Sequence, residues 1–225
     1  FVDDRAGRPA RPLRFGLIPT VAPYLLPEIF PALRAALPET HYAISENHTD
    51  GLLAGLADGT LDLALVATAP KPGGPSLTVA PLFSDPFVLA TAPGDAPAGP
   101  VPLRELDTAS LLLLNEGHCF RDQAIAACSL SDGEASRAFA ATSLSTIVEF
   151  VANGLGITLL PAIAVRKEAA DGRIRVHELA SPGASRQLSL VWREGSPFAE
   201  LFARIAAIIA NQAPLTPGEP PRPQA

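Results

Sequence analysis

Residues 13–33 read LRFGLIPTVAPYLLPEIFPAL, and the hydrophobic pattern changes within this stretch in a way that decides the fold. Residues 13–19 form a short apolar run of the kind expected for a buried strand. Over residues 24–37 the apolar side chains recur at the spacing of one helix face. Proline fits the first turn of a helix and disrupts its interior, so we expect the helix to begin near Pro27 and to kink or restart at Pro31. A strand followed directly by a helix predicts an α/β fold.

The alternation continues through the first third of the chain. Residues 41–47 alternate like a strand, and a helix capped by Thr49 or Asp50 closes near Gly59. Residues 61–68 then form a second buried strand of the same kind. The order β-α-β-α-β predicts a parallel sheet with helices on its faces.

A second, similar run follows. Residues 77–91 predict extended segments broken at Asp85-Pro86, and the Pro/Gly/Ala-rich stretch 92–100 predicts a loop. Two such runs in series predict two Rossmann-like lobes with a cleft between them. Ligands of open α/β sheets bind beyond the carboxyl ends of the strands, so we expect a binding site in that cleft. The further predicted strands are 111–114, 138–142, 157–160, 174–179 and 187–192, and the further helices start at Ser143, after Pro161 and at Ser196-Pro197.

These patterns divide the chain into four parts. We expect residues 1–12 to be a linker and the Pro-rich residues 213–225 to be a disordered tail. Residues 13–81 together with 188–212 are predicted to form lobe I, and residues 82–187 to form lobe II with both cysteines. The chain contains no methionine and opens without the apolar stretch of a signal peptide, which suggests a fragment of a longer protein.

Composition excludes several classes of protein. With 225 residues, 48% hydrophobic and 18% charged, the chain has ordinary globular composition. No apolar run approaches the roughly 18 residues of a membrane span, so we expect no membrane partner. A net charge of −6 without a basic patch argues against direct nucleic-acid binding by this chain. Two cysteines are too few for a secreted disulfide scaffold and favour a reducing compartment such as the cytoplasm.

Both cysteines lie in residues 115–130, NEGHCFRDQAIAACSL. A zinc site needs about four ligands and usually Cys-x₂₋₄-Cys spacing, so this pair nine positions apart predicts no metal site. If the segment is helical from Arg121, with Cys119 at or just before its start, nine residues correspond to about 13.5 Å of rise and to opposite faces. A disulfide needs a Cα separation of about 5.5–6 Å, so one could form only if the segment unwinds.

Chemistry alone leaves two interpretations of these thiols open. Free cysteine is among the most buried residue types, and the apolar surroundings of Cys128 suit an inert core thiol. Cys119 lies near a predicted helix N-terminus with Arg121 two residues on, which favours the thiolate of a redox sensor. Thr20 and Thr49 each follow a predicted strand and could converge with Cys119 on one crevice. The alternative is a purely structural role, as a turn residue for Thr20 and as a helix N-cap for Thr49.

Several stretches resemble the regulatory domain of the peroxide-responsive LysR-type transcriptional regulators, over about residues 13–210. The resemblance implies a two-lobed, periplasmic-binding-protein-like fold, the LysR substrate-binding domain, preceded by a DNA-binding helix-turn-helix domain that this chain lacks. The cysteine segment is the most specific of these stretches, because most effector domains of the family lack such a pair. The matching stretches are GLIPTVAPYLLPEIFPAL (16–33), LLAGLADGTLDLAL (52–65), GHCFRDQAIAAC (117–128), ATSLSTIVEFVANGLGITLLPAIAV (141–165) and GSPFAELF (195–202).

The resemblance also implies roles for individual residues. Cys119 would be oxidised by hydrogen peroxide to a sulfenic acid, which would condense with Cys128 to a disulfide and switch conformation and transcription. The residues implied to place or activate peroxide are Thr20, Thr49, His118, Arg121 and Asp122. The sequence departs from the family in two places: His48 stands where we expect glutamine, and residues 129–136 are polar and differ in detail.

The implied partners follow from the same resemblance. They are hydrogen peroxide, further copies of the chain in a homodimer or homotetramer, promoter DNA through the missing domain, RNA polymerase and a cellular thiol reductant. No cofactor is implied, and the protein would be a regulator rather than an enzyme. Three other functions remain as alternatives: a LysR-type domain that binds a small organic effector and has inert cysteines, a thiol peroxidase, and a solute-binding protein.

Overall fold

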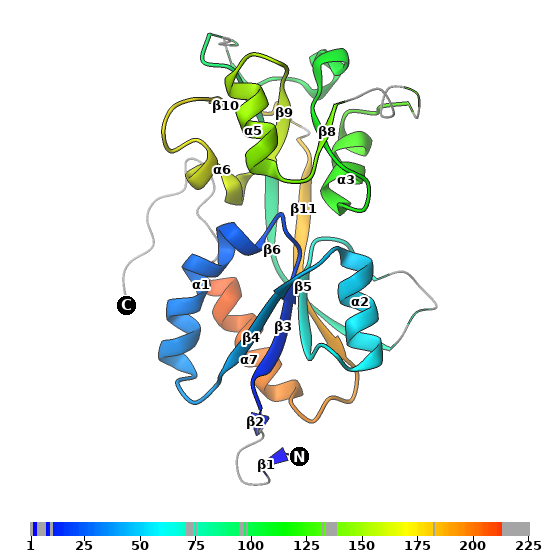
Figure 1. Ribbon diagram of the computed structural model, residues 1–225, viewed down its shortest axis with the longest axis vertical. Coiled ribbons are helices and arrows are strands. Elements are labelled where there is room, and N and C mark those ends of the chain that lie inside the picture. The colour runs from blue at the N-terminus through cyan, green and yellow to red at the C-terminus, as the bar shows by residue number, and fades with distance from the viewer. Residues whose placement is uncertain are drawn as a thin grey trace.

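A computed structural model describes residues 2–3, 8–9, 11–70, 74, 76–94, 97, 99–131, 133, 139–181 and 183–212. The elements lie in two groups along the long axis of the molecule, and two long strands run through both groups (Figure 1). We call the group nearer the start of the chain lobe I and the other group lobe II. The predicted tail, 213–225, and half of the predicted linker, residues 1, 4–7 and 10, lie outside the described residues.

Lobe I is built on three parallel strands. The central one, β3, pairs with β4 on one side and β5 on the other, so that Phe15 is level with Ile44 and with Leu63. Helices α1 and α7 contact each other, and α2 packs on β5 (Figure 1). The predicted β-α-β-α-β order is confirmed. The bounds are β3 (Leu13–Leu17), α1 (Ala22–Ala36), β4 (Tyr42–Glu46), α2 (Thr49–Asp58), β5 (Leu63–Val66) and α7 (Ala199–Asn211).

Lobe II holds the middle of the chain. Its small elements repeat the strand-then-helix order, and β7 and β8 are again parallel. Two 3₁₀ turns, Leu103–Glu105 and Thr108–Ser110, precede them, and β1 (Val2–Asp3) and β2 (Arg8–Pro9) pair separately near the start of the chain. The bounds are β7 (Leu113–Leu114), α3 (Cys119–Ala127), β8 (Ala140–Ala141), α5 (Leu144–Ala152), β9 (Thr158–Pro161), α6 (Ala162–Glu168) and β10 (Arg175–Glu178).

Two antiparallel strands, β6 (Leu77–Thr91) and β11 (Ser185–Arg193), join the lobes. They make the whole sheet mixed, with the order β10-β6-β11-β5-β3-β4 and β9 beside β6, while the parallel sheet predicted for residues 13–68 is confirmed in β3, β4 and β5. The predicted break at Asp85-Pro86 is wrong, because β6 continues through it. Pro86 lies opposite Ser185, the first residue of β11, where a missing N–H disturbs the ladder least. The exact residue bounds of the lobes stay a prediction.

Helix α1 begins five residues earlier than Pro27. Pro23 occupies its first turn, while Pro27 and Pro31 lie inside the helix, both on its exposed side. Each interior proline removes one backbone hydrogen bond, and burial of the opposite face compensates for the loss. The residues that α1 buries are Ala22, Tyr24, Leu25, Ile29 and Leu33. Among the described residues, no helix combines the length and apolar character needed to cross a bilayer.

Candidate functional site

Cys119 is the first residue of α3. Gly117 takes a positive φ of 91°, a conformation that suits glycine, and His118 follows with an extended backbone as the N-cap. The chain thereby turns sharply after Asn115, and the Arg121 amide then bonds to the His118 carbonyl at 2.9 Å. Cys119 is half-buried. The free N–H groups and the dipole of this helix end favour negative charge at that position.

Cys128 is the C-cap of the same helix and is also a free, half-buried thiol. Nine residues of intact helix separate the two cysteines by about 13.5 Å along the axis, so they are not in bonding range. Burial raises the pKa of the Cys128 thiol. Directly after it, Ser129 holds a positive φ of 52°, which is strained for a residue with a side chain. The two thiols therefore differ both in place and in environment.

A narrow pocket lies at the Cys119 end of α3. Three chain segments meet there: the turn after β3, the start of α2 and the start of α3. Its empty space, open solvent included, is about 170 Å³, so it is a narrow crevice that cannot enclose an organic ligand. The structure thus brings Thr20, Thr49, His118 and Cys119 together. The complete lining is Ile18, Pro19, Thr20, His48, Thr49, Gly117, His118 and Cys119.

The hydroxyl of Thr49 is unusual in this pocket. Its Oγ1 is buried and has no hydrogen-bond partner in the described part of the chain. Thr49 does not cap α2 either, because the N-cap is His48, whose side chain makes no capping bond. A buried hydroxyl without a partner costs free energy unless something else bonds to it. The Thr49 hydroxyl is therefore available to hydrogen-bond to a polar ligand in the pocket.

Thr20 is held by a residue that the sequence analysis missed. Arg186 on β11 donates from Nη1 to Thr20 Oγ1 at 2.8 Å and from Nη2 to the Thr20 carbonyl at 3.0 Å. It also forms a fully buried ion pair with Asp85, with 2.9 Å between Nε and Oδ2. Its guanidinium lies 5.3 Å from the Phe120 ring centre. Burial raises the pKa of Asp85 in spite of this partner.

Arg121 and Asp122 do not line the pocket. The guanidinium of Arg121 is buried and donates from Nη1 to the Leu114 carbonyl at 2.9 Å, at the end of β7. Asp122 is exposed on the first turn of α3. Arg121 thus ties α3 to lobe II, and a direct role of either residue in placing peroxide stays a prediction.

Two histidines form one wall of the pocket. The rings of His48 and His118 are tilted against each other with 4.4 Å between their centres. His118 is almost fully buried. Burial, and next the neighbouring His48, lower the pKa of His118, while a hydrogen bond to the Thr142 backbone works in the opposite direction. His118 is therefore mostly a neutral imidazole at pH 7.

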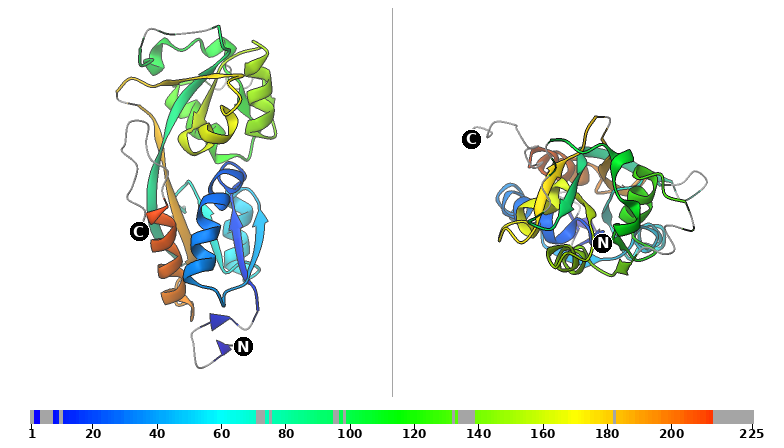
Figure 2. Two further views of the ribbon diagram at one scale, coloured as in Figure 1. Left: turned by 90° about the vertical axis from the view of Figure 1, so that its left-hand side faces the viewer. Right: turned by 90° about the horizontal axis from the view of Figure 1, so that it is seen from above.

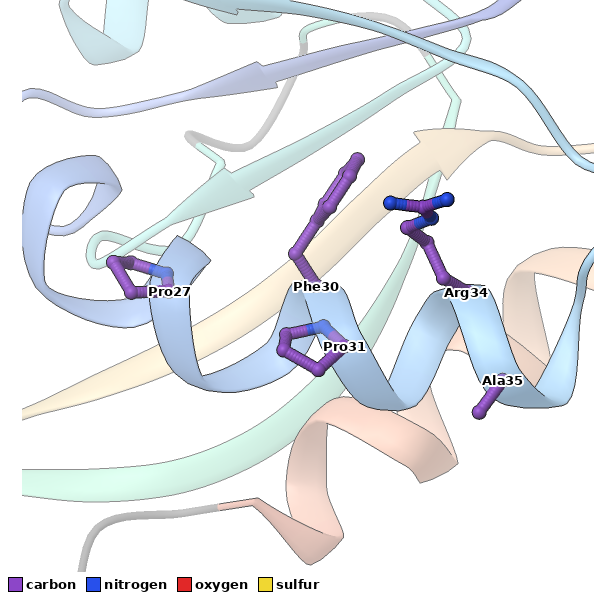
Figure 3. Close-up of a pocket in the computed structure, with 5 residues that line it drawn as sticks. All are labelled: Pro27, Phe30, Pro31, Arg34 and Ala35. Atoms are coloured by element: carbon purple, nitrogen blue, oxygen red, sulfur yellow. The ribbon is translucent and has the colours of Figure 1, made fainter.

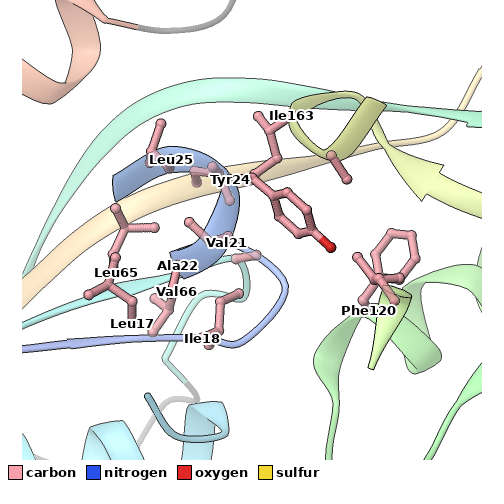
Figure 4. Packing of buried hydrophobic residues seen from close by; sticks show 14 of the residues in the cluster. Leu17, Ile18, Val21, Ala22, Tyr24, Leu25, Leu65, Val66, Phe120 and Ile163 are labelled. Carbon is pink, nitrogen blue, oxygen red and sulfur yellow. The ribbon is translucent and has the colours of Figure 1, made fainter. Parts of the chain in front are cut away.

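The pocket lies where the two lobes meet. Gln123 on α3 donates to the Ala67 carbonyl at 2.8 Å, beyond the end of β5. Tyr24 extends from α1 toward lobe II, near Ile163 and Phe120 (Figure 4), and its hydroxyl donates to Glu168 Oε1 at 2.8 Å. The bond from Gln123 holds α3 against lobe I, and the bond from Tyr24 joins α1 to α6 of lobe II. Movement of α3 is thereby linked to the relative position of the lobes.

A larger hollow lies elsewhere, on the outer side of α1 (Figure 3). It is open, with about 890 Å³ of empty space including solvent, and its lining is Pro27, Phe30, Pro31, Arg34 and Ala35. It contains no nucleophile and lies on α1 of lobe I, whereas the cysteines lie on α3 of lobe II. Across the residues that the structure describes, no group of three or more histidine, cysteine or carboxylate side chains is arranged to hold a metal ion.

Comparison with known proteins agrees with this geometry. Residues 6–214 match the family described as the LysR substrate binding domain. The hydrogen peroxide-inducible genes activator of Haemophilus influenzae is 37% identical over 203 residues, which are 89% of this chain and 67% of that protein. A probable activator of the same name from Mycobacterium avium is 40% identical over 88% of this chain and 64% of its own length. This chain thus spans about two thirds of the length of these relatives.

A solved structure gives the same result. The reduced form of the OxyR regulatory domain from Pseudomonas aeruginosa superimposes with a TM-score of 0.81 at 32% identity, covering 95% of this chain and 98% of that one. At 95% coverage the likeness extends over both lobes of this chain, which Figure 2 shows from two further directions. The chain therefore belongs to the LysR substrate binding domain family and is similar, within it, to the hydrogen peroxide-inducible genes activators.

Proposed function

We propose that this chain is the peroxide-sensing regulatory domain of a LysR-type transcription factor. The observation that carries the proposal is the placement of Cys119 at the N-terminus of α3, in a pocket of about 170 Å³ that it shares with the unpartnered Thr49 hydroxyl. A crevice this narrow admits at most a ligand of a few atoms, such as hydrogen peroxide. It has no room for an organic effector, which disfavours the other main function considered for a domain of this family.

The first chemical step is oxidation of Cys119. Its thiolate attacks one oxygen of hydrogen peroxide, an S–O bond forms as the O–O bond breaks, and the departing hydroxide takes up a proton to become water. The sulfur loses two electrons and the peroxide gains them. Thr20, oriented by Arg186, and Thr49 supply hydroxyls on the pocket wall that bond to the peroxide oxygens.

The second step joins the two cysteines. The Cys128 sulfur displaces hydroxide from the Cys119 sulfenic acid, which gives the disulfide and one water. Intact α3 prevents this, so the helix must unwind. Helices shorter than about 12 residues are marginal without packing, and α3 has 9 residues, of which only Phe120, Arg121 and Ala124 are buried. All three lie in its first two turns, so we expect the end near Cys128 to unwind first.

The partners of the whole protein are proposals of the same kind. We infer that refolding of α3 changes contacts between copies of the chain in a homodimer or homotetramer. That change would alter promoter binding by a separate DNA-binding domain and contact with RNA polymerase. Return to the reduced state needs a cellular thiol reductant. Because DNA and such reductants are found in the cytoplasm, we propose that location, and a regulatory function without enzymatic turnover.

Counting thiols under peroxide tests the proposal. The reduced chain is treated with one equivalent of hydrogen peroxide, alongside Cys119→Ser and Cys128→Ser. We expect loss of both thiols in the parent, a trapped sulfenic acid in Cys128→Ser and no reaction in Cys119→Ser. A Cys119 that reacts no faster than free cysteine would contradict the proposal and would favour inert thiols.

A further inference from the structure

We propose that His48 and His118 act as a pair that accepts the proton of the Cys119 thiol and returns it to the departing hydroxide. The inference rests on the proposed oxidation of Cys119 and adds to it a residue, His48, that none of the roles described above includes. It starts from the position of both rings on the wall of the Cys119 pocket, with centres 4.4 Å apart.

The backbone around Gly117 allows this contact. A Cβ at Gly117 would lie 2.7 Å from His48 Nδ1, which is closer than real Cβ contacts permit. The positive φ of Gly117 and its missing side chain thus open the space in which His48 from lobe I meets His118 from lobe II. The two lobes together therefore build the pair.

The side chain of His48 does not serve as the cap of α2. His48 is the N-cap of α2, but its imidazole makes no capping bond, and only its backbone takes part, with the carbonyl accepting from Leu52 at 3.0 Å. Its amide donates to Asn47 Oδ1 at 2.8 Å. A capping role would be served by a shorter polar residue. The imidazole is thus available for chemistry in the pocket.

The state of His118 suits proton acceptance. It hydrogen-bonds to the Thr142 backbone through one side of its ring, which leaves the other ring nitrogen of a neutral imidazole with a free lone pair. Burial and the neighbouring His48 both disfavour a positive charge on it. His118 is therefore a neutral base that can accept a proton from the Cys119 thiol.

The other charged groups around the pocket cannot accept the thiol proton in place of the two histidines. Arg186 on β11 is always protonated and is engaged by Thr20 and Asp85, so it cannot accept a proton. The carboxylates on the surrounding elements point to solvent and are not part of the pocket lining. They are Glu46 at the end of β4, Asp50 on the first turn of α2, Glu116 before α3 and Asp122 on its first turn.

The proton balance follows directly. The thiol proton passes to an imidazole of the pair, and the thiolate then attacks peroxide to give the sulfenic acid and hydroxide. The imidazolium returns its proton to that hydroxide, which leaves as water, and the pair is neutral again. Once His118 is protonated it cannot accept the thiol proton, so the oxidation rate falls as the pH falls. Because the pKa of His118 is lowered, we expect this fall below pH 6.5, its ordinary value.

The test is the rate of Cys119 oxidation by hydrogen peroxide between pH 5 and 8, measured in the Cys128→Ser background. His48→Gln keeps the size and hydrogen bonding of the side chain but cannot carry a proton. General acid–base groups contribute roughly 10²–10⁴-fold, so we expect His48→Gln to lose about tenfold and the double variant with His118→Gln about 10²-fold. His41→Gln, on the surface before β4, is the matched control and should retain the parent rate.

Nuclear magnetic resonance titration of the histidine rings supplies a second measurement that a purely structural role would not affect. Removing His48 removes the neighbour that lowers the pKa of His118, so in His48→Gln the His118 midpoint should move to higher pH, and the acid fall of the rate with it. Equal rates and an unmoved His118 midpoint would overturn the inference. If the parent itself does not react with peroxide, the proposed function fails too. A reactive parent with an equally reactive double variant overturns the histidine pair alone.

Discussion

Arg186 donates to Thr20 Oγ1 across 2.8 Å, so a residue 166 positions further along the chain orients a hydroxyl in the Cys119 pocket. The same guanidinium is paired with Asp85, and both of these side chains are fully buried. Thr20 belongs to lobe I, whereas Asp85 also accepts a bond from the amide of Ile163 on α6 in lobe II. One ion pair thus links the pocket to both lobes.

The first prediction concerns this ion pair. Breaking a buried pair by removing one partner costs about 3–5 kcal/mol, because the other charge remains buried without compensation. We expect Arg186→Gln to lower the free energy of unfolding by that amount, measured by urea denaturation, and to slow Cys119 oxidation as Thr20 loses its donor. Arg175→Gln, exposed on β10, is the control and should change neither quantity.

A double variant separates stability from function at this pair. Asp85→Asn with Arg186→Gln leaves no uncompensated charge, so it should recover much of the lost stability while oxidation stays slow. If the double variant is as unstable as Arg186→Gln, the ion pair is not the cause of the loss.

The second prediction concerns the unpartnered hydroxyl of Thr49. Removing a buried polar group that has no partner is neutral or stabilising. The free energy of unfolding of Thr49→Val should therefore lie within about 0.5 kcal/mol of the parent value or above it. Its Cys119 should nevertheless react more slowly with peroxide, because the pocket loses a donor to the oxidant. Thr49→Ser retains the hydroxyl and should retain the rate. A large loss of stability in Thr49→Val would show that the hydroxyl has a structural partner after all.

Much of the fold could be predicted from periodicity, because local patterns report local structure. Residues 13–68 have clean strand and helix spacing, and the first lobe follows from them. The antiparallel course of β6 and β11 could not be predicted, since pairing between strands about 100 residues apart leaves no local pattern. For the same reason α1 was expected to start at Pro27: the buried face that overrides its prolines is a tertiary feature.

The candidate site divides in the same way. Cys119, Thr20 and Thr49 could be singled out because strand ends and helix starts are local features. Arg186 could not, because its importance comes from Thr20 and Asp85, which are distant in sequence. The sequence marks His48 only as a departure from a family pattern, because its contact with His118 depends on how the lobes meet.

The third prediction concerns the bond from Gln123 to the Ala67 carbonyl, which holds α3 against lobe I. Gln123→Ala leaves that carbonyl without its donor, so we expect a loss of about 1 kcal/mol in the free energy of unfolding. Formation of the disulfide should become faster, because α3 is released more easily, while formation of the sulfenic acid stays unchanged. Stopped-flow measurement of the two phases separates them. The control is Gln212→Ala, exposed at the end of α7.

The fourth prediction concerns pH and the buried thiol of Cys128. Its pKa is raised in the fold by burial, so the folded chain keeps that proton to higher pH than the unfolded chain does. The resulting stability is fully present below the pKa of the unfolded thiol, about 8.5, and is lost as the pH rises through the folded pKa. Urea denaturation of the reduced chain between pH 7 and 10 should show a steeper loss in the parent than in Cys128→Ala. Parallel curves for the two proteins would contradict this expectation.

The last prediction concerns Ser129, whose φ of 52° directly after Cys128 is strained for a residue with a Cβ. Such a conformation costs roughly 1–2 kcal/mol, and glycine adopts it without that penalty, although glycine gains entropy in the unfolded chain. Ser129→Gly should therefore stabilise the reduced chain by about 1 kcal/mol net and hold the end of α3 closed. Because unwinding must precede the disulfide, its formation should slow by roughly fivefold. Ser129→Ala keeps the Cβ and the strain, so it should behave like the parent; slowing in both variants would instead point to the hydroxyl.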